Sequence, residues 1–132
     1  MKAKKLIVKL FLLVITILLL GGCKMFDNKP TLTKVQQDNV VKRISRYYEF
    51  EQITFKQFKK DSNTGSLLLT IELNGSENMR TTIIFDDMRD FNDSSSEIGL
   101  SPISHFESIR REKELSIISV NITKLNIKYL EE

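Results

Sequence analysis

The stretch Ser66-Leu67-Leu68-Leu69-Thr70-Ile71-Glu72-Leu73 decides the fold of this chain. Its odd positions, from 67 to 73, are all apolar, whereas polar residues hold three of its four even positions. Successive side chains of a strand point to opposite faces, so this alternation predicts a strand with one buried face. Such a strand needs neighbouring strands and a second layer to cover its apolar side.

Turn-forming residues flank this strand on both sides, at 61–65 and 74–78. Beyond them the alternation resumes, in a first strand around Ile53 and Phe55 and in a third strand from Met79 to Phe85. Because these turns suit tight connections, we expect the three strands to form an antiparallel meander. The solvent-facing side of the sheet would then carry polar residues, among them Thr54, Lys56, Thr70 and Glu72.

An amphipathic helix is predicted upstream of the strands, with Thr33 as its N-cap and its end near Tyr48. Apolar residues recur in it at steps of three to four, which is the period of a helix packed on one side. The apolar stripe consists of Val35, Val40, Val41, Ile44, Tyr47 and Tyr48, and the polar face of Gln36, Lys42, Arg43 and Arg46.

The chain beyond the third strand is less regular. Residues 86–104 are rich in Asp, Asn and Ser and predict a long acidic loop. Residues 103–111 predict a short helical turn that directs Phe106 and Ile109 inward. In the segment 115–130 the apolar positions change from even to odd, which indicates either a bulge or two short strands.

These elements together predict an α+β domain over residues 33–132. Its N-terminal amphipathic helix packs on a four-stranded, mainly antiparallel sheet, and the acidic loop connects the third and fourth strands. About 100 residues are enough for one domain with its own core.

The stretch Leu20-Gly21-Gly22-Cys23 predicts a site of lipid attachment. It follows a basic start and an apolar run from Leu10 to Leu20, the arrangement of a secretory signal. Lys9 interrupts the longer apolar run from Leu6, which leaves fewer than the roughly 20 residues that span a bilayer. We therefore expect residues 1–22 to be a lipoprotein signal peptide cut after Gly22, with diacylglycerol on Cys23 and residues 23–32 as a tether.

Removal of the signal changes the charge of the chain. Four of the 20 lysines and arginines precede Cys23, so the segment from Cys23 onward has 16 basic and 17 acidic residues, a formal net charge of −1. This balance excludes the strongly basic class of nucleic-acid-binding domains. Cys23 is the only cysteine, so no disulfide within the chain supports the domain.

The acidic loop is the first candidate site, through Asp86, Asp87, Asp90 and Asp93. Its carboxylates are oxygen ligands of the kind that calcium prefers, but they lack the spacing and the glycine of an EF-hand loop. A solvated loop or a partner-binding loop is therefore favoured over a metal site, and we expect no cofactor.

Two further groups of residues are candidate sites. His105 lies between Ser104 and Glu107, but neighbours in sequence do not make a catalytic triad, and the interpretation favoured is a surface or packing residue. Tyr47, Tyr48 and Phe50 suggest either a ligand pocket or core and rim residues at the end of the helix, and the second is favoured.

The whole pattern resembles the small lipoproteins of Gram-positive bacteria that carry an uncharacterised α+β domain. The resemblance rests on Leu20-Gly21-Gly22-Cys23, on the helix from Thr33, on Ile53-Thr54-Phe55 with Thr64-Gly65-Ser66, and on Asn126-Ile127-Lys128-Tyr129-Leu130. The resemblance supplies no catalytic residues, and it implies a protein anchored to the extracytoplasmic face of the cell membrane.

The functional expectation is a non-enzymatic lipoprotein that binds another protein at the cell surface, for instance as an immunity factor against a toxin. The alternative is a lipoprotein that binds a small solute or an envelope polymer in a pocket near Tyr48 and Phe50.

Overall fold

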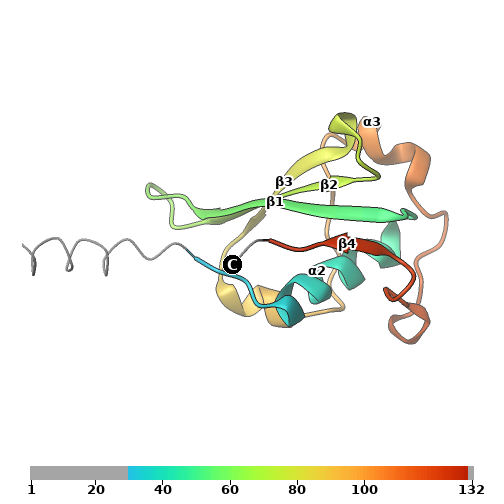
Figure 1. Cartoon of the computed structure of the whole chain (residues 1–132), viewed down its shortest axis with the longest axis horizontal. Helices are drawn as coiled ribbons and strands as arrows, with labels where there is room; N and C mark the ends of the chain where they lie inside the picture. Colours follow the sequence, from blue (N-terminus) through green and yellow to red (C-terminus); the bar gives the residue numbers. More distant parts are fainter. Residues whose placement is uncertain (1–29, 131–132) are drawn as a thin grey trace, which may run out of the picture.

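The computed structural model describes residues 30–130 of the chain. They form an α+β structure with one helix of 14 residues and one mixed sheet of four strands. The expected signal peptide, the cleavage position Gly22 and the lipid site Cys23 lie outside the described residues. Figure 1 shows the helix α2 lying along one side of the sheet, with the strand β4 next to β1.

The helix α2 spans Lys34–Tyr47 and begins where the sequence predicts. The Thr33 hydroxyl accepts a hydrogen bond from the Gln36 N–H at 3.1 Å, and the Gln36 side chain accepts one from the Thr33 N–H at 2.9 Å. This reciprocal pair is a capping box, which satisfies two N–H groups at the start of the helix. The prediction that Thr33 is the N-cap is therefore confirmed.

The predicted meander is also confirmed. β1 (Gln52–Lys60), β2 (Leu67–Leu73) and β3 (Arg80–Phe85) pair antiparallel in sequence order. Their inner faces and most of the apolar stripe of α2 form one core, in which Val40, Ile44, Ile53, Leu69 and Ile71 are completely buried. Val35 departs from the predicted stripe, because it lies in the first turn of α2 and is 68% exposed.

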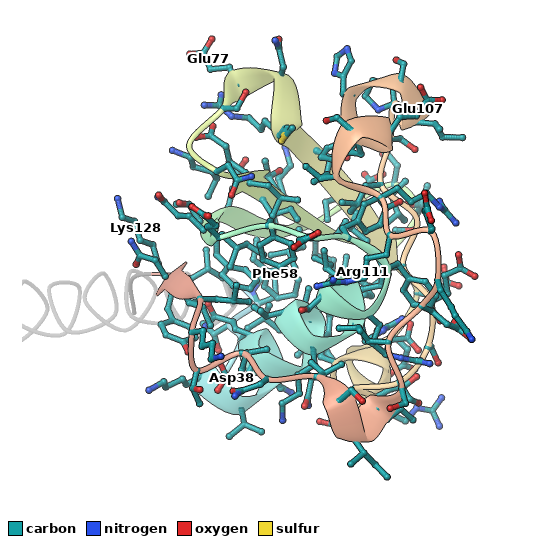
Figure 2. All side chains as sticks on the ribbon, turned by 90° about the vertical axis from the view of Figure 1, so that its right-hand side faces the viewer. Asp38, Phe58, Glu77, Glu107, Arg111 and Lys128 are labelled. Carbon is teal, nitrogen blue, oxygen red and sulfur yellow. The ribbon has the colours of Figure 1, made fainter. Side chains whose placement is uncertain are left out.

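A β-bulge at Lys56 was not predicted. Phe55 pairs with Ile71 and Gln57 with Thr70, which leaves Lys56 as an extra residue of β1. The bulge shifts the side-chain alternation by one position, so Phe55 and Phe58 both pack on the core. Figure 2 shows Phe58 in the interior, between the sheet and α2.

The fourth strand differs from the prediction. Residues 115–130 form neither a bulged strand nor two strands, but the 3-10 turn η4 (Ile117–Ser119) and the short strand β4 (Asn126–Lys128). β4 pairs parallel with β1, so the sheet has the order β3-β2-β1-β4 with two antiparallel pairings and one parallel pairing. The segment first runs beside the end of α2, where the Leu115 N–H donates to the Arg46 carbonyl at 2.9 Å. The segment therefore approaches β1 from the end at which β1 begins, and so β4 runs parallel to β1.

The predicted acidic loop is more structured and more apolar than expected. After β3 come η2 (Met88–Asn92), α3 (Ile103–Phe106) and η3 (Glu107–Ile109), and η1 (Glu77–Met79) precedes β3. The expected helical turn near residue 103 is present, with Phe106 buried and Ile109 half-buried. The core also takes in isolated apolar residues of the loop, namely Phe91, Ile98 and Leu100. Such isolated residues have no period, and so the sequence pattern did not identify them.

Candidate functional site

The acidic loop uses most of its predicted site residues to hold its own backbone. Asp87 caps η2: its carboxylate accepts from the Arg89 N–H at 2.8 Å and from the Arg89 guanidinium at 3.0 Å. These bonds hold the pKa of Asp87 below its usual range. The Asp90 carboxylate completes the cap by accepting from the Asp87 N–H at 3.3 Å.

Asp93 is bound in the same way. Its carboxylate accepts hydrogen bonds from the Ser96 hydroxyl and from the hydroxyl and N–H of Ser95. These bonds hold the pKa of Asp93 well below its usual range. Asp86 lies at the surface just after β3. Between residues 30 and 130, no three His, Cys, Asp or Glu side chains are grouped so that they could hold a metal ion.

Two arginines of α2 attach the acidic loop to the helix. Arg43 Nε donates to the Ser96 carbonyl at 2.9 Å, and its Nη1 donates to the Asp90 carbonyl at 3.0 Å. Arg46 donates to the carbonyls of Ser95 and of Leu115. Burial lowers the pKa of Arg43, which is only 7% exposed.

The prediction that Arg43 and Arg46 belong to a solvated helix face is therefore wrong. The loop covers that face, and backbone carbonyls replace the water around the guanidinium groups. One signal was present in the sequence. Arg43 follows Val40 by three positions and directly precedes Ile44, so it lies next to the apolar stripe.

The other predicted groups do not form a site. His105, Ser104 and Glu107 are all exposed around α3, and within the described residues no hydrogen bond joins their side chains. Tyr48 and Phe50 are buried in the core, as favoured. The Tyr48 hydroxyl accepts from the Leu100 N–H at 3.3 Å, and its ring packs edge-to-face on Phe106. Both side chains therefore serve as core residues at the end of the helix.

The face of the sheet opposite α2 carries paired side chains. The hydroxyls of Thr70 and Thr82 are 2.9 Å apart, and the Arg80 guanidinium forms an ion pair with Glu72 at 2.8 Å. Thr54, Lys56 and Thr70 are at least partly exposed, as predicted, but Glu72 is only 6% exposed. Glu72 departs from the prediction because its carboxylate is engaged by the cross-strand partner Arg80.

A groove lies along the outer edge of the sheet. β3 forms one wall, through the residues from Thr82 to Phe85, and the segment 97–101 forms the other. Arg43 and Asp90 also line the groove, which has a volume of about 400 Å³. Ile84 is 67% exposed beside it. The sequence did not reveal the groove, because it depends on how close segment 97–101 comes to β3.

A second hollow, of about 420 Å³, lies between the start of α2 and the segment around β4. The Tyr129 hydroxyl donates to the Asp38 carboxylate there at 2.6 Å, and the Tyr129 ring is stacked with Phe55 at 6.4 Å. Burial and the bond to Asp38 raise the pKa of Tyr129 to about 12. Figure 2 shows Asp38 on α2, below the end of β4 that Lys128 marks.

The chain matches no protein-family model, no curated protein and no solved structure. None of the helices in residues 30–130 has the length and apolar character needed to cross a membrane.

Proposed function

We propose that this chain is a membrane-anchored extracytoplasmic lipoprotein that binds another protein at the cell surface and catalyses no reaction. Two acyl chains on one cysteine give stable anchoring, so diacylglycerol on Cys23 would keep the domain at the membrane. Immunity, in which the domain blocks a toxin at the membrane, is one role that such a protein fills.

The observation that carries the proposal is the open outer layer of the sheet. One helix covers one face, whereas the opposite face and the edge of β3 meet solvent with Thr82 and Ile84 exposed. A polar sheet face suits protein docking better than it suits a small ligand, because small-molecule sites are concave and lined mostly by apolar side chains. The acidic loop adjoins this layer, because Asp86 directly follows β3.

Covalent cross-linking on intact cells tests the proposal. The tagged full chain is cross-linked, and the captured proteins are identified by mass spectrometry. One protein captured by the wild type and lost in an outer-face variant, Thr82→Arg, would support docking. Recovery of no specific protein by the wild-type chain would overturn it.

A single substitution tests whether the acidic loop contributes to partner binding. Charge reversal at Asp87 or Asp90 would break the cap of η2, so those variants would report on folding as well as on binding. Asp86→Lys changes an exposed carboxylate instead, and Glu112→Lys is a control with the same charge change at another exposed position. Partner capture that falls in Asp86→Lys but not in Glu112→Lys would place the loop in the interface.

The second candidate is a lipoprotein that binds a small solute or an envelope polymer. The hollow lined by Lys34, Asp38 and Tyr129 is the observation that favours it, because polar groups there surround an aromatic ring. A ligand that binds only the folded state raises the melting temperature. A thermal-shift panel of cell-wall saccharide fragments, repeated with Asp38→Ala, distinguishes this function from protein docking.

A further inference from the structure

We infer that the free edge of β3 binds an extended, basic segment of a partner protein, which adds to the sheet as a fifth strand. This inference rests on the proposed function and names the docking site and the chemistry of its partner. Extended segments bind sheet edges through backbone hydrogen bonds, and their side chains provide the specificity.

The outer side of the β3 backbone offers N–H and C=O groups to which such a partner can bind. β3 lies at one end of the sheet and pairs only with β2. An edge strand directs alternate N–H and C=O groups away from its neighbour. Within residues 30–130, the backbone of Thr81–Phe85 makes no hydrogen bond outside that pairing. Only the Thr81 hydroxyl bridges the groove, donating to the Ser101 carbonyl at 2.7 Å.

The two edges of the sheet differ in a way that selects β3. The edge strand β4 has only three residues, and Lys128 points outward from it in Figure 2. Short length and an outward lysine are the features by which proteins prevent pairing at an edge. β3 has six residues, or about 20 Å of strand, and carries exposed Ile84 in place of a lysine.

The opposite wall leaves the groove open beside residues 82–85. Segment 97–101 runs beside β3, but no backbone hydrogen bond joins the two across the groove. Gly99 is in this wall, and a Cβ atom placed on it would meet no other atom within 4 Å. The space next to Gly99 is therefore unfilled.

The charges along the groove select a basic segment. Asp90 and Glu97 line it, Glu97 in a half-exposed ion pair with Arg110, and exposed Asp86 follows the end of β3. Arg43 is the one cation among the residues that line the groove, and two of its nitrogen atoms already donate to carbonyls. Alternate residues of an added strand would face these carboxylates, and the residues between them would lie beside Ile84. A segment that alternates basic and apolar residues therefore complements both the carboxylates and Ile84.

A short acetylated peptide of alternating lysine and valine is the probe. It is titrated into the ¹⁵N-labelled full chain in detergent micelles, and the backbone amides are followed by NMR and hydrogen exchange. We expect shifts in Thr81–Phe85 and at least tenfold slower exchange of their outward amides. A glutamate–valine peptide tests the charge, and an N-methylated lysine–valine peptide tests the backbone bonds. Absence of shifts in β3 at millimolar peptide, or equal effects of all three peptides, would overturn the inference.

Two variants change the two walls of the groove, one on each side. Ile84→Lys places a charge on the edge, and Val35→Lys is its control because Val35 is 68% exposed on α2, away from the groove. Gly99→Leu adds a large side chain to the opposite wall, at a position where a Cβ atom meets no other atom within 4 Å. We expect both groove variants to keep the wild-type melting temperature and to lose at least tenfold in peptide affinity.

The same variants separate this inference from the proposed function. If cells still yield the wild-type partner with Ile84→Lys and Gly99→Leu, docking stands and the β3 edge is excluded. If the wild-type chain captures no protein but binds the lysine–valine peptide at β3, the edge site stands and the surface-docking function fails.

Discussion

Arg43 Nε donates to the backbone carbonyl of Ser96 at 2.9 Å and so joins the helix α2 to the acidic loop, 53 positions further along the chain. The same side chain reaches the Asp90 carbonyl through Nη1, and its guanidinium lies 5.8 Å from the centre of the Phe85 ring. One buried cation therefore connects the helix, the loop and the last residue of β3. The position of the carboxylates near the groove depends on it.

Replacing Arg43 by lysine should destabilise the domain by about 1–3 kcal/mol, because a lysine cannot reproduce two bonds from one planar group. Urea denaturation of both proteins measures the change. Arg110→Lys is the control, since the Arg110 guanidinium pairs with Glu97 at 3.6 Å where both side chains are about half-exposed. A change below about 0.5 kcal/mol in Arg43→Lys would show that the attachment contributes little.

Tyr129 should titrate well above the usual range of a tyrosine. Its pKa is raised to about 12, first by burial and then by the bond to the Asp38 carboxylate. A raised folded-state pKa means that the stabilisation is complete below the unfolded value near 10 and is lost as the pH rises towards 12. In a spectrophotometric titration, Tyr129→Phe should remove the step near pH 12 and cost about 1 kcal/mol of stability at pH 7. Persistence of that step in the variant would contradict the assignment.

Acid should weaken the acidic loop through Asp93. Its folded-state pKa lies well below the unfolded value of about 3.9, because hydroxyl and N–H groups of Ser95 and Ser96 donate to the carboxylate. The stabilisation is present above pH 4 and is lost as the pH falls below it. Asp93→Asn keeps one oxygen acceptor without the charge. We expect its urea midpoint to fall less than that of the wild type between pH 5 and pH 2, and parallel pH profiles would refute this.

The turn after β2 should depend on Asn74. Its φ is 54°, a left-handed conformation, and its side-chain oxygen accepts from the N–H groups of Glu51 at 2.9 Å and Gln52 at 3.1 Å. Asn74→Ala combines backbone strain with two lost bonds and should cost about 2–3 kcal/mol. Asn74→Gly relieves the strain but not the loss of bonds, so thermal denaturation should place it between alanine and the wild type. Equal melting temperatures for the two variants would mean that strain contributes nothing.

Lipid attachment should depend on Cys23. A cysteine after two small residues and an apolar run is where we expect diacylglycerol. Cys23→Ala should release the domain into the medium or leave the precursor uncut, whereas the wild type should partition into the detergent phase. Fractionation with an antibody to the domain measures this. Mature Cys23→Ala protein that remains at the membrane would contradict lipid anchoring.

Local patterns predicted the regular part of the fold. The alternation around Leu69 and Ile71 and the Asn74-Gly75 turn depend on neighbouring residues, so the three-stranded meander could be predicted without any tertiary structure. The helix starts at its capping box for the same reason. The bulge at Lys56 was missed because a strand of nine residues shows too few periods to reveal one shifted position.

The candidate site was less predictable. The carboxylates of Asp87 and Asp93 were recognised as a group, but their side chains bind backbone and hydroxyl groups within three residues, which composition does not indicate. The groove was missed because its walls, β3 and segment 97–101, are brought together by core residues such as Ile98 and Leu100 that follow no period.

The sequence by itself determined the meander, the amphipathic helix and the capping box, since each depends on contacts between residues close in the chain. Only the tertiary structure decided the parallel pairing of β4 with β1, the burial of Arg43 and the groove beside β3. Each of these depends on contacts between residues far apart in the chain, as between Ser96 and Arg43 or between Asn126 and Glu51. Such contacts form because buried polar groups must find partners and apolar side chains must leave water, and no local pattern records which partner that is.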